Sequence, residues 1–232
     1  GFVDIEDENL GGTLLKDGHV PCPDSLLHLS QNECLFIKGS EKGIALAKRV
    51  GDELKLIRNG QEAYGIKGKN KEQAFALDLL MDPKIHLVTL SGTAGTGKTL
   101  ISLAAGLEQV LTKKKYKKMM VYRPIQPMGN DIGFTPGEIS DKLRPWMGPI
   151  YDGLELLLGS GGNFAAKLDE LIYRERISFE ALTYIRGRSI NDCFMVIDEG
   201  QNISKEEMKT ILTRAGNNTK IIVTGDGDQV DR

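Results

Sequence analysis

The sequence predicts an α/β fold in which a parallel sheet flanked by helices follows a small antiparallel β unit. Of the 232 residues, 40% are hydrophobic, which is enough for the core of one large domain, or of one medium domain and a small one. Short apolar runs separated by turn residues fill residues 13–66, whereas from residue 69 onward strand-length apolar runs alternate with helical periodicity. We therefore expect a small β subdomain at 13–66 and a larger α/β domain at 67–232.

The composition excludes several classes of protein. With 27% charged residues beside the hydrophobic fraction, the chain is neither disordered nor fibrous. The formal net charge of −2 means that any surface for nucleic acid must be a local patch. No apolar run approaches the about 20 residues of a membrane span. Three widely spaced cysteines are typical of a reducing compartment, so we expect a cytoplasmic protein that does not bind membranes.

The first 66 residues show no pattern that points to chemistry. Residues 1–12 are acidic and then glycine-bearing, which indicates a tail or linker. Farther along, Gly51-Asp52 separates the apolar stretches 47–50 and 54–57, and this arrangement predicts a hairpin. We interpret 13–66 as an antiparallel β unit.

The remaining elements alternate between strands and helices. Ser204 and Glu207 have the spacing of a capping box, and Gly216 is placed to end the helix that follows. The apolar runs predict strands at 85–90, 119–122, 194–197 and 221–223, and helices at 98–111, 139–158 and 204–215.

A phosphate-binding loop lies between the first predicted strand and helix of this region. The sequence Gly92-Thr93-Ala94-Gly95-Thr96-Gly97-Lys98-Thr99 fits the pattern G-x-x-x-x-G-K-[ST], and Leu100 continues it into the helix. The glycines let backbone N–H groups surround phosphates at a helix N-terminus. Lys98 would reach the β and γ phosphates, and the Thr99 hydroxyl would bind Mg²⁺.

Two carboxylates end the predicted strand 194–197. Asp198 would hold Mg²⁺, and Glu199 would orient or deprotonate an attacking water. A solvated Asp-Glu pair alone would be unremarkable, but beside a phosphate loop it indicates the second half of a nucleoside-triphosphatase site. This pair favours hydrolysis over phosphoryl transfer to a small acceptor, because a kinase must exclude water.

A third polar cluster, Gly225-Asp226-Gly227-Asp228-Gln229, ends the strand at 221–223. Parallel strands deliver such groups to the carboxyl edge of the sheet, where these folds bind ligands. The Gln229 amide could reach the γ-phosphate or the attacking water, and Asp226 could support Mg²⁺. Taken alone, the cluster is equally consistent with an ordinary Gly-Asp turn.

The order of the three elements resembles that of superfamily 1 helicases, which also carry an adenine-reading glutamine upstream. Gln73 stands at the corresponding distance before the phosphate loop. The alternative is an exposed glutamine at a helix start. Tyr64 could stack on the base or belong to the core.

Strings between these elements resemble the PhoH-like ATPase family over about residues 64–231. They are Tyr122-Arg123-Pro124, the stretches 129–137 and 142–146, Tyr184-Ile185-Arg186-Gly187-Arg188, Asp198-Glu199-Gly200-Gln201-Asn202 and the stretch 212–216. The resemblance implies an ATPase with a RecA-like core, ATP as substrate, Mg²⁺ as cofactor, a hexameric ring with nucleotide at subunit interfaces, and single-stranded RNA as the polymer. It also implies that longer members carry an upstream PIN-type ribonuclease domain, for which residues 1–60 are too short. Because the family continues past the third cluster, we expect this chain to be part of a longer protein.

An arginine from a neighbouring subunit would complete such a site by stabilising charge on the γ-phosphate. Arg186 and Arg188 in the R-G-R turn are the preferred candidates, and Arg123 and Arg214 are others. Surface salt bridges are the alternative role for each.

Two functional hypotheses remain open. The first is an ATP-hydrolysing motor or remodeller acting on RNA, with possible helicase activity. The second is a nucleotide-gated assembly module that regulates a fused nuclease with little turnover of its own; Glu199 favours the first. The lysines at 113–118 could bind RNA phosphates, or could simply solubilise a helix C-terminus.

Overall fold

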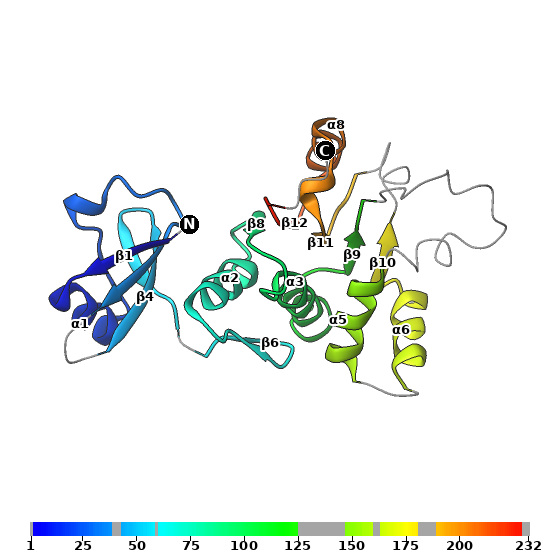
Figure 1. Ribbon diagram of the computed structural model, residues 1–232, viewed down its shortest axis with the longest axis horizontal. Helices are drawn as coiled ribbons and strands as arrows, with labels where there is room; N and C mark the ends of the chain where they lie inside the picture. Colours follow the sequence, from blue (N-terminus) through cyan, green and yellow to red (C-terminus); the bar gives the residue numbers. More distant parts are fainter. Residues whose placement is uncertain are drawn as a thin grey trace. The chain divides into compact units, whose positions relative to one another are not determined.

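The computed structural model describes residues 2–38, 43–58, 60–124, 147–159, 163–180 and 189–228. The chain divides into two compact units, and each unit contains a five-stranded sheet. Unit 1 comprises Gly1–Glu62 and Lys67–Leu79, and unit 2 comprises Ala63–Ile66 and Leu80–Arg232. Figure 1 shows the elements of both.

The sheet of unit 1 has the order β1-β3-β4-β5-β2, and its strands are antiparallel except for β1. The bounds are β1 (Phe2–Glu6), β2 (His19–Pro21), β3 (Cys34–Lys38), β4 (Ile44–Val50) and β5 (Glu53–Leu56). The predicted hairpin is confirmed, because Val50 pairs with Glu53 across a turn in which Gly51 has a φ of 63°. Only glycine adopts such a left-handed conformation at little cost.

The first residues are not a tail or linker. They form β1, which pairs in parallel with β3, and the start of α1 (Glu8–Asp17). Val3 and Ile5 pack against the unit's core, and the Asp7 carboxylate accepts the Leu10 N–H at 2.9 Å to cap the helix. The acidic residues therefore occupy exposed strand positions and a helix start, where composition alone resembles that of a linker.

A helix completes unit 1. The helix α2 (Lys71–Met81) begins in unit 1, and its Phe75 packs with Cys34 and Leu46 of the sheet. Its Asp78 lies 2.7 Å from the ammonium of Lys48 on β4. Short elements complete the path of the chain before β8: a 3₁₀ turn at Asp24–Leu26, β6 (Glu62–Ala63) and β7 (Ile66–Lys67).

The sheet of unit 2 is entirely parallel, with the order β10-β9-β11-β12-β8. Its strands are β8 (Leu87–Ser91), β9 (Lys118–Tyr122), β10 (Ile177–Glu180), β11 (Cys193–Ile197) and β12 (Thr219–Gly225). The four predicted strands are confirmed, and β10 is an additional edge strand. Because β12 lies between β8 and β11, the ends of all three strands meet at one edge. This is the arrangement of a RecA-like P-loop fold.

Helices cover both faces of this sheet. In Figure 1, α3 (Lys98–Leu107), α5 (Gly148–Leu158) and α6 (Phe164–Tyr173) lie on one side of the strands, and α8 (Lys205–Leu212) lies on the other. A π-helical turn at Glu108–Thr112 continues α3. Of the predicted helix 139–158, the described part is α5, and residues 125–146 lie outside the described ranges.

The capping box of α8 is confirmed, but its predicted end is wrong. The Ser204 hydroxyl accepts the Glu207 N–H, and the Glu207 carboxylate accepts the Ser204 N–H. The helix ends at Leu212, and Gly216 donates its N–H to the Ile190 carbonyl at 2.8 Å instead of capping it. Gly216 is needed for space, since an added Cβ would collide with the Asn191 carboxamide.

Within the described ranges, no helix is both long enough and apolar enough to cross a membrane.

Candidate functional site

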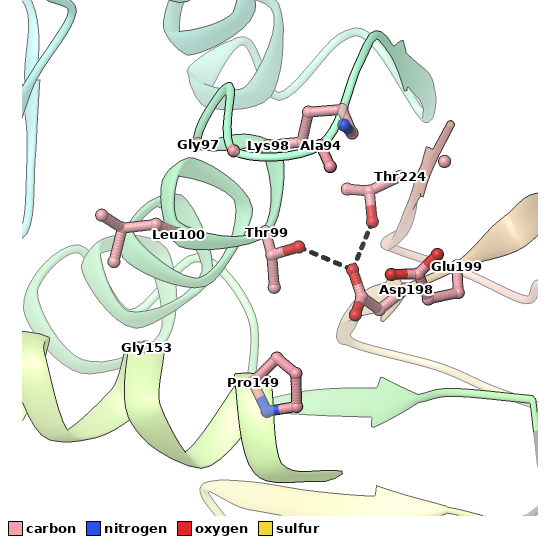
Figure 2. A pocket seen from close by; sticks show the side chains of 12 residues that line it. Ala94, Gly97, Lys98, Thr99, Leu100, Pro149, Gly153, Asp198, Glu199 and Thr224 are labelled. Atoms are coloured by element: carbon pink, nitrogen blue, oxygen red, sulfur yellow. Dashed lines mark hydrogen bonds between the residues drawn. The ribbon is translucent and has the colours of Figure 1, made fainter. Parts of the chain in front are cut away.

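A pocket of about 300 Å³ opens at the carboxyl edge of the sheet in unit 2. The phosphate loop, the start of α3, the ends of β11 and β12 and one face of α5 form its walls (Figure 2). It is lined by Ala94, Gly95, Gly97, Lys98, Thr99, Leu100, Pro149, Gly153, Asp198, Glu199, Thr224 and Gly225. The pocket therefore brings together the phosphate loop and the Asp-Glu pair, which lie about a hundred residues apart in the chain.

The backbone of the phosphate loop depends on two glycines. Gly95 and Gly97 have φ values of 78° and 86°, in the left-handed region that residues with a Cβ rarely adopt. Helix α3 begins directly after Gly97, so the unpaired N–H groups of its first turn face the pocket. The Gly92 N–H donates to the Gly225 carbonyl at 3.3 Å, which joins the start of the loop to the end of β12.

The Lys98 ammonium lies within the loop. It donates to the carbonyls of Gly92 at 2.6 Å and Thr93 at 2.8 Å. These contacts hold the cation beside the loop backbone, where it can exchange a carbonyl partner for a phosphate oxygen.

Asp198 is the most buried charged group of the site, with 2% of its surface exposed. Its Oδ1 accepts hydrogen bonds from the Thr99 and Thr224 hydroxyls, each at 2.7 Å, as Figure 2 shows. Its Oδ2 accepts a hydrogen bond from Nη1 of Arg123 at 3.1 Å. Donors from α3, from β12 and from the residue after β9 thus satisfy one carboxylate, which offsets the free energy lost by removing it from water.

Glu199 has an unusual backbone conformation. Its φ of 54° is left-handed, which costs roughly 1–2 kcal/mol for a residue with a Cβ. The carboxylate is held at both oxygens: Oε1 lies 3.6 Å from Nη2 of Arg123, and Oε2 accepts from Nε2 of Gln201 at 2.6 Å. Such strain is often retained where a side chain must be aimed.

Arg123 contacts the site of its own chain. It follows β9, the neighbour of β11, and its guanidinium contacts both Asp198 and Glu199. The sequence suggests Arg123 as a candidate for donation to a neighbouring subunit, but here it neutralises carboxylates in cis. Arg214, another candidate, follows α8, and its carbonyl accepts the Ile190 N–H at 2.8 Å.

The other predicted site residues belong to unit 1 or lie outside the described ranges. Gln229, Arg186 and Arg188 belong to segments that the structure does not describe. Gln73 lies in the first turns of α2 in unit 1, where its side-chain carbonyl accepts the Lys69 N–H at 2.8 Å.

Sequence reasoning missed several contacts of the pocket. Thr224 follows an apolar run that gives no sign of a polar role. Its hydroxyl donates to Asp198 only because β12 lies beside β11. Gln201 belongs to the string 198–202 of the family resemblance, but the sequence assigns it no contact. Pro149 and Gly153 reach the pocket because α5 packs against α3, which the sequence does not reveal.

The oxygen atoms of Thr99 and Asp198 fit Mg²⁺. A hydroxyl and a carboxylate that share a hydrogen bond beneath the phosphate loop are the hard oxygen donors this ion prefers. Within the described residues, no group of three or more His, Cys, Asp and Glu side chains is placed to form a complete metal cage. Mg²⁺ usually takes one or two protein oxygens and completes its shell with phosphates and water, and Thr99 and Asp198 offer two such side chains.

Two titratable groups buried in the sheet of unit 2 stay protonated: Tyr122 at the pocket end of β9 and Cys193 at the opposite end of β11. Burial, followed by the charge of Glu207, raises the pKa of Tyr122 to about 12. Burial raises the pKa of Cys193 to about 12. Neither group offers a nucleophile at neutral pH, so the carboxylates carry the chemistry of this edge.

The lysine run lies at the other end of the sheet. Lys118 begins β9, whereas the pocket lies where the parallel strands end. Lys117 lies 2.9 Å from Asp192, and its hydrogen bond is the main cause that lowers the pKa of that carboxyl. A phosphate backbone bound by this run would therefore lie away from the pocket.

Comparison with known proteins identifies the family to which this chain belongs. Residues 65–232 match the family model described as PhoH-like protein. The chain belongs to the PhoH-like family. It is 49% identical over 195 residues to Protein PhoH2 of Bacillus subtilis, covering 83% of this chain and 44% of that protein. It is 34% identical over 230 residues to Protein PhoH2 of Mycolicibacterium smegmatis, covering 99% of this chain and 51% of that protein.

A shorter relative also matches. The PhoH-like protein of Bacillus subtilis is 30% identical over 236 residues, covering 88% of this chain and 72% of that protein. The chain thus spans about half the length of the PhoH2 relatives. Family and fold together make it a P-loop, ATPase-like protein.

Proposed function

We propose that this chain binds ATP with Mg²⁺ at the pocket of unit 2 and hydrolyses it. The observation that carries the proposal is the convergence of Lys98, Thr99, Asp198 and Glu199 on one pocket. Each of these residues supplies what phosphoryl transfer to water requires: a cation for the phosphates, oxygens for the metal and a carboxylate for the nucleophile.

The phosphate loop binds the triphosphate. Backbone N–H groups between Gly92 and Leu100 face its oxygens, and the Lys98 ammonium contacts the β and γ phosphates. Thr99 and Asp198 would hold Mg²⁺, which would neutralise negative charge on the phosphates. The Thr224 hydroxyl fixes the orientation of Asp198 from β12.

Glu199 orients the attacking water and accepts its proton. A carboxylate with 33% of its side chain exposed is reachable by solvent, and one hydrogen bond and one ion pair restrict its direction. Hydrolysis is therefore favoured over transfer to an acceptor.

The proposal also includes four residues that the sequence singles out. We assign adenine recognition to Gln73 and γ-phosphate contact to Gln229. We assign transition-state stabilisation by a neighbouring subunit to Arg186 and Arg188. We also propose that the predicted β subdomain at 13–66 corresponds mainly to unit 1, and the predicted ATPase domain at 67–232 mainly to unit 2.

The family resemblance supports RNA coupling. We propose single-stranded RNA as the polymer, a hexameric ring as the assembly, and a ribonuclease domain in the longer protein as the partner of the ATPase. Unwinding of RNA would be one output of such a ring.

Phosphate release from ATP, measured with and without single-stranded RNA, tests the proposal. We expect RNA-stimulated release in the wild type and a loss of about 100-fold or more in Glu199→Gln. Glu206→Gln is the matched control, because it removes an exposed carboxylate from the first turn of α8. Tight ATP binding with negligible release in the wild type would instead support the nucleotide-gated assembly module.

A further inference from the structure

The side chain of Gln201 connects two strand ends of the pocket. It lies in the 3₁₀ turn Gly200–Asn202 that follows β11. Its Nε2 donates to Oε2 of Glu199 at 2.6 Å, and its Oε1 accepts the backbone N–H of Asp226 at 3.1 Å. One amide therefore joins the proposed catalytic carboxylate to the loop after β12.

An amide is the side-chain group that this position requires. The Glu199 carboxylate only accepts hydrogen bonds, and the Asp226 N–H only donates one. A carboxamide has a donor and an acceptor at one end, so it satisfies both partners in a single orientation. A carboxylate at this position would keep the acceptor and lose the donor.

Close packing leaves this connection little freedom. A Cβ added at Gly225 would lie 2.9 Å from Oε1 of Gln201, so the glycine gives the amide its space. A Cβ added at Gly200 would collide with the Val223 side chain of β12. The turn after β11 therefore lies directly against the end of β12, and a shift of one moves the other.

The loop after β12 is itself fixed at its start. Asp226 is 5% exposed, and its Oδ1 accepts the Asp228 N–H at 3.1 Å. Asp226 and Glu199 are both hydrogen-bonded to the Gln201 side chain, so a displacement of Asp226 can alter the direction of Glu199. On the opposite side of Glu199, Arg123 holds the other carboxylate oxygen.

We propose that Gln201 is a positioning residue that aims the Glu199 carboxylate and couples it to the loop at 225–228. The proposal rests on the hydrolytic function assigned to Glu199. When Asp226 is in place, Gln201 holds Glu199 toward the pocket. When the loop shifts, Glu199 loses its donor, and hydrolysis slows while ATP still binds.

Two substitutions separate the two ends of the amide. Gln201→Ala removes both hydrogen bonds. Gln201→Glu keeps an acceptor for the Asp226 N–H, removes the donor to Glu199 and places a second carboxylate beside it. Glu206→Gln again serves as the control for a change in the same segment.

We expect Gln201→Ala to lower turnover by about 10- to 100-fold, with ATP affinity within about twofold of the wild type. We expect Gln201→Glu to be equally slow, because it lacks the donor to Glu199 and places a like charge beside that carboxylate.

Hydrogen–deuterium exchange supplies a readout that does not depend on turnover. The peptide containing residues 225–228 should exchange faster in Gln201→Ala and as in the wild type in Gln201→Glu, because only the alanine removes the acceptor of the Asp226 N–H.

Turnover and ATP affinity together distinguish a failure of the Gln201 proposal from a failure of the proposed ATPase function. If Glu199→Gln stops turnover but both Gln201 variants remain within about twofold of the wild type, the positioning role is wrong and the ATPase stands. An equal loss of ATP affinity and turnover would assign Gln201 a structural role and also overturn the proposal. If the wild type releases no phosphate, the proposed function fails, and the positioning role fails with it.

Discussion

The two five-stranded sheets of this chain use polar residues in different ways. In unit 1, buried or half-buried charges pair with a nearby element: Lys48 of β4 contacts Asp78 of α2 at 2.7 Å, and Arg49 donates to the Leu27 carbonyl at 2.6 Å. In unit 2, the polar groups at the strand ends share partners. The Asp198 carboxylate accepts hydrogen bonds from Thr99 in the helix after β8, from Arg123 after β9 and from Thr224 within β12.

Strand direction explains this difference. Parallel strands all end at one edge, so residues distant in sequence gather there, whereas antiparallel strands distribute their ends over both edges. Unit 2 also retains a left-handed Glu199 at that edge. We infer that the polar groups of unit 1 stabilise its fold, and that those of unit 2 are arranged for a ligand.

The largest effect should follow from Lys98→Ala in unit 2. Removing the cation that faces the phosphates should lower turnover at subsaturating ATP by about 100-fold or more and change the free energy of unfolding by less than about 0.5 kcal/mol. Phosphate release and urea unfolding measure the two quantities. Lys84→Ala, an exposed lysine of the same unit, should alter neither.

Breaking the ion pair between Lys48 and Asp78 in unit 1 should lower the stability of the fold, whereas Lys98→Ala should lower turnover. Asp78→Ala leaves the Lys48 ammonium, whose side chain is 9% exposed, without its carboxylate and should lower the free energy of unfolding by about 2–4 kcal/mol. Glu53→Ala, in the exposed pair with Lys55, should cost less than about 1 kcal/mol. Equal urea midpoints for the two variants would contradict the contrast between buried and exposed pairs.

A smaller effect is expected for Thr224→Val. The substitution preserves shape but removes a hydroxyl that is 1% exposed and donates to Asp198, at a cost of about 1–3 kcal/mol in stability. Thr224→Ser should restore most of it. A serine variant as unstable as the valine would mean that the methyl group matters, and not the hydrogen bond.

The smallest expected effect is on the ionisation of the buried thiols, and here the two units should behave alike. Burial raises the pKa of Cys34 in unit 1 from 9.0 to about 11, and that of Cys193 in unit 2 from 9.0 to about 12. Because the folded state keeps these thiols protonated, their contribution to stability is complete below about pH 9 and is lost as the pH rises toward 11 and 12.

Alkylation at mildly alkaline pH, followed by mass spectrometry of the native protein, checks this expectation. The partly exposed Cys22 should react first, and Cys34 and Cys193 should react only on unfolding. Early labelling of either buried thiol would contradict the packing of that core.

The parts of this molecule that the sequence predicts are those encoded by adjacent residues. The phosphate loop, the Asp-Glu pair and the Ser204 cap are each contained in a short stretch, so their chemistry and local conformation can be predicted together. The alternation of strands and helices in unit 2 follows from apolar runs for the same reason.

The missed features depend on long-range order or on composition. The contacts of Thr224 and Arg123 with Asp198 exist because β12 and β9 flank β11, and a single sequence does not encode that neighbourhood in any one segment. Strand β1 is difficult to predict because its Val3 and Ile5 alternate with the acidic Asp4 and Glu6. The composition of this stretch is that of a linker, although the acidic residues form the exposed face of a strand.

Hydrogen–deuterium exchange of Glu199→Gln with and without ATP and Mg²⁺ tests the central claim most directly, because the variant should bind nucleotide without consuming it. We predict protection of the peptides that contain the phosphate loop and the ends of β11 and β12, and no change in β3, β4 and β5 of unit 1. Protection confined to the sheet of unit 1, or none at the phosphate loop at saturating ATP, would contradict the assignment of the ligand site to unit 2.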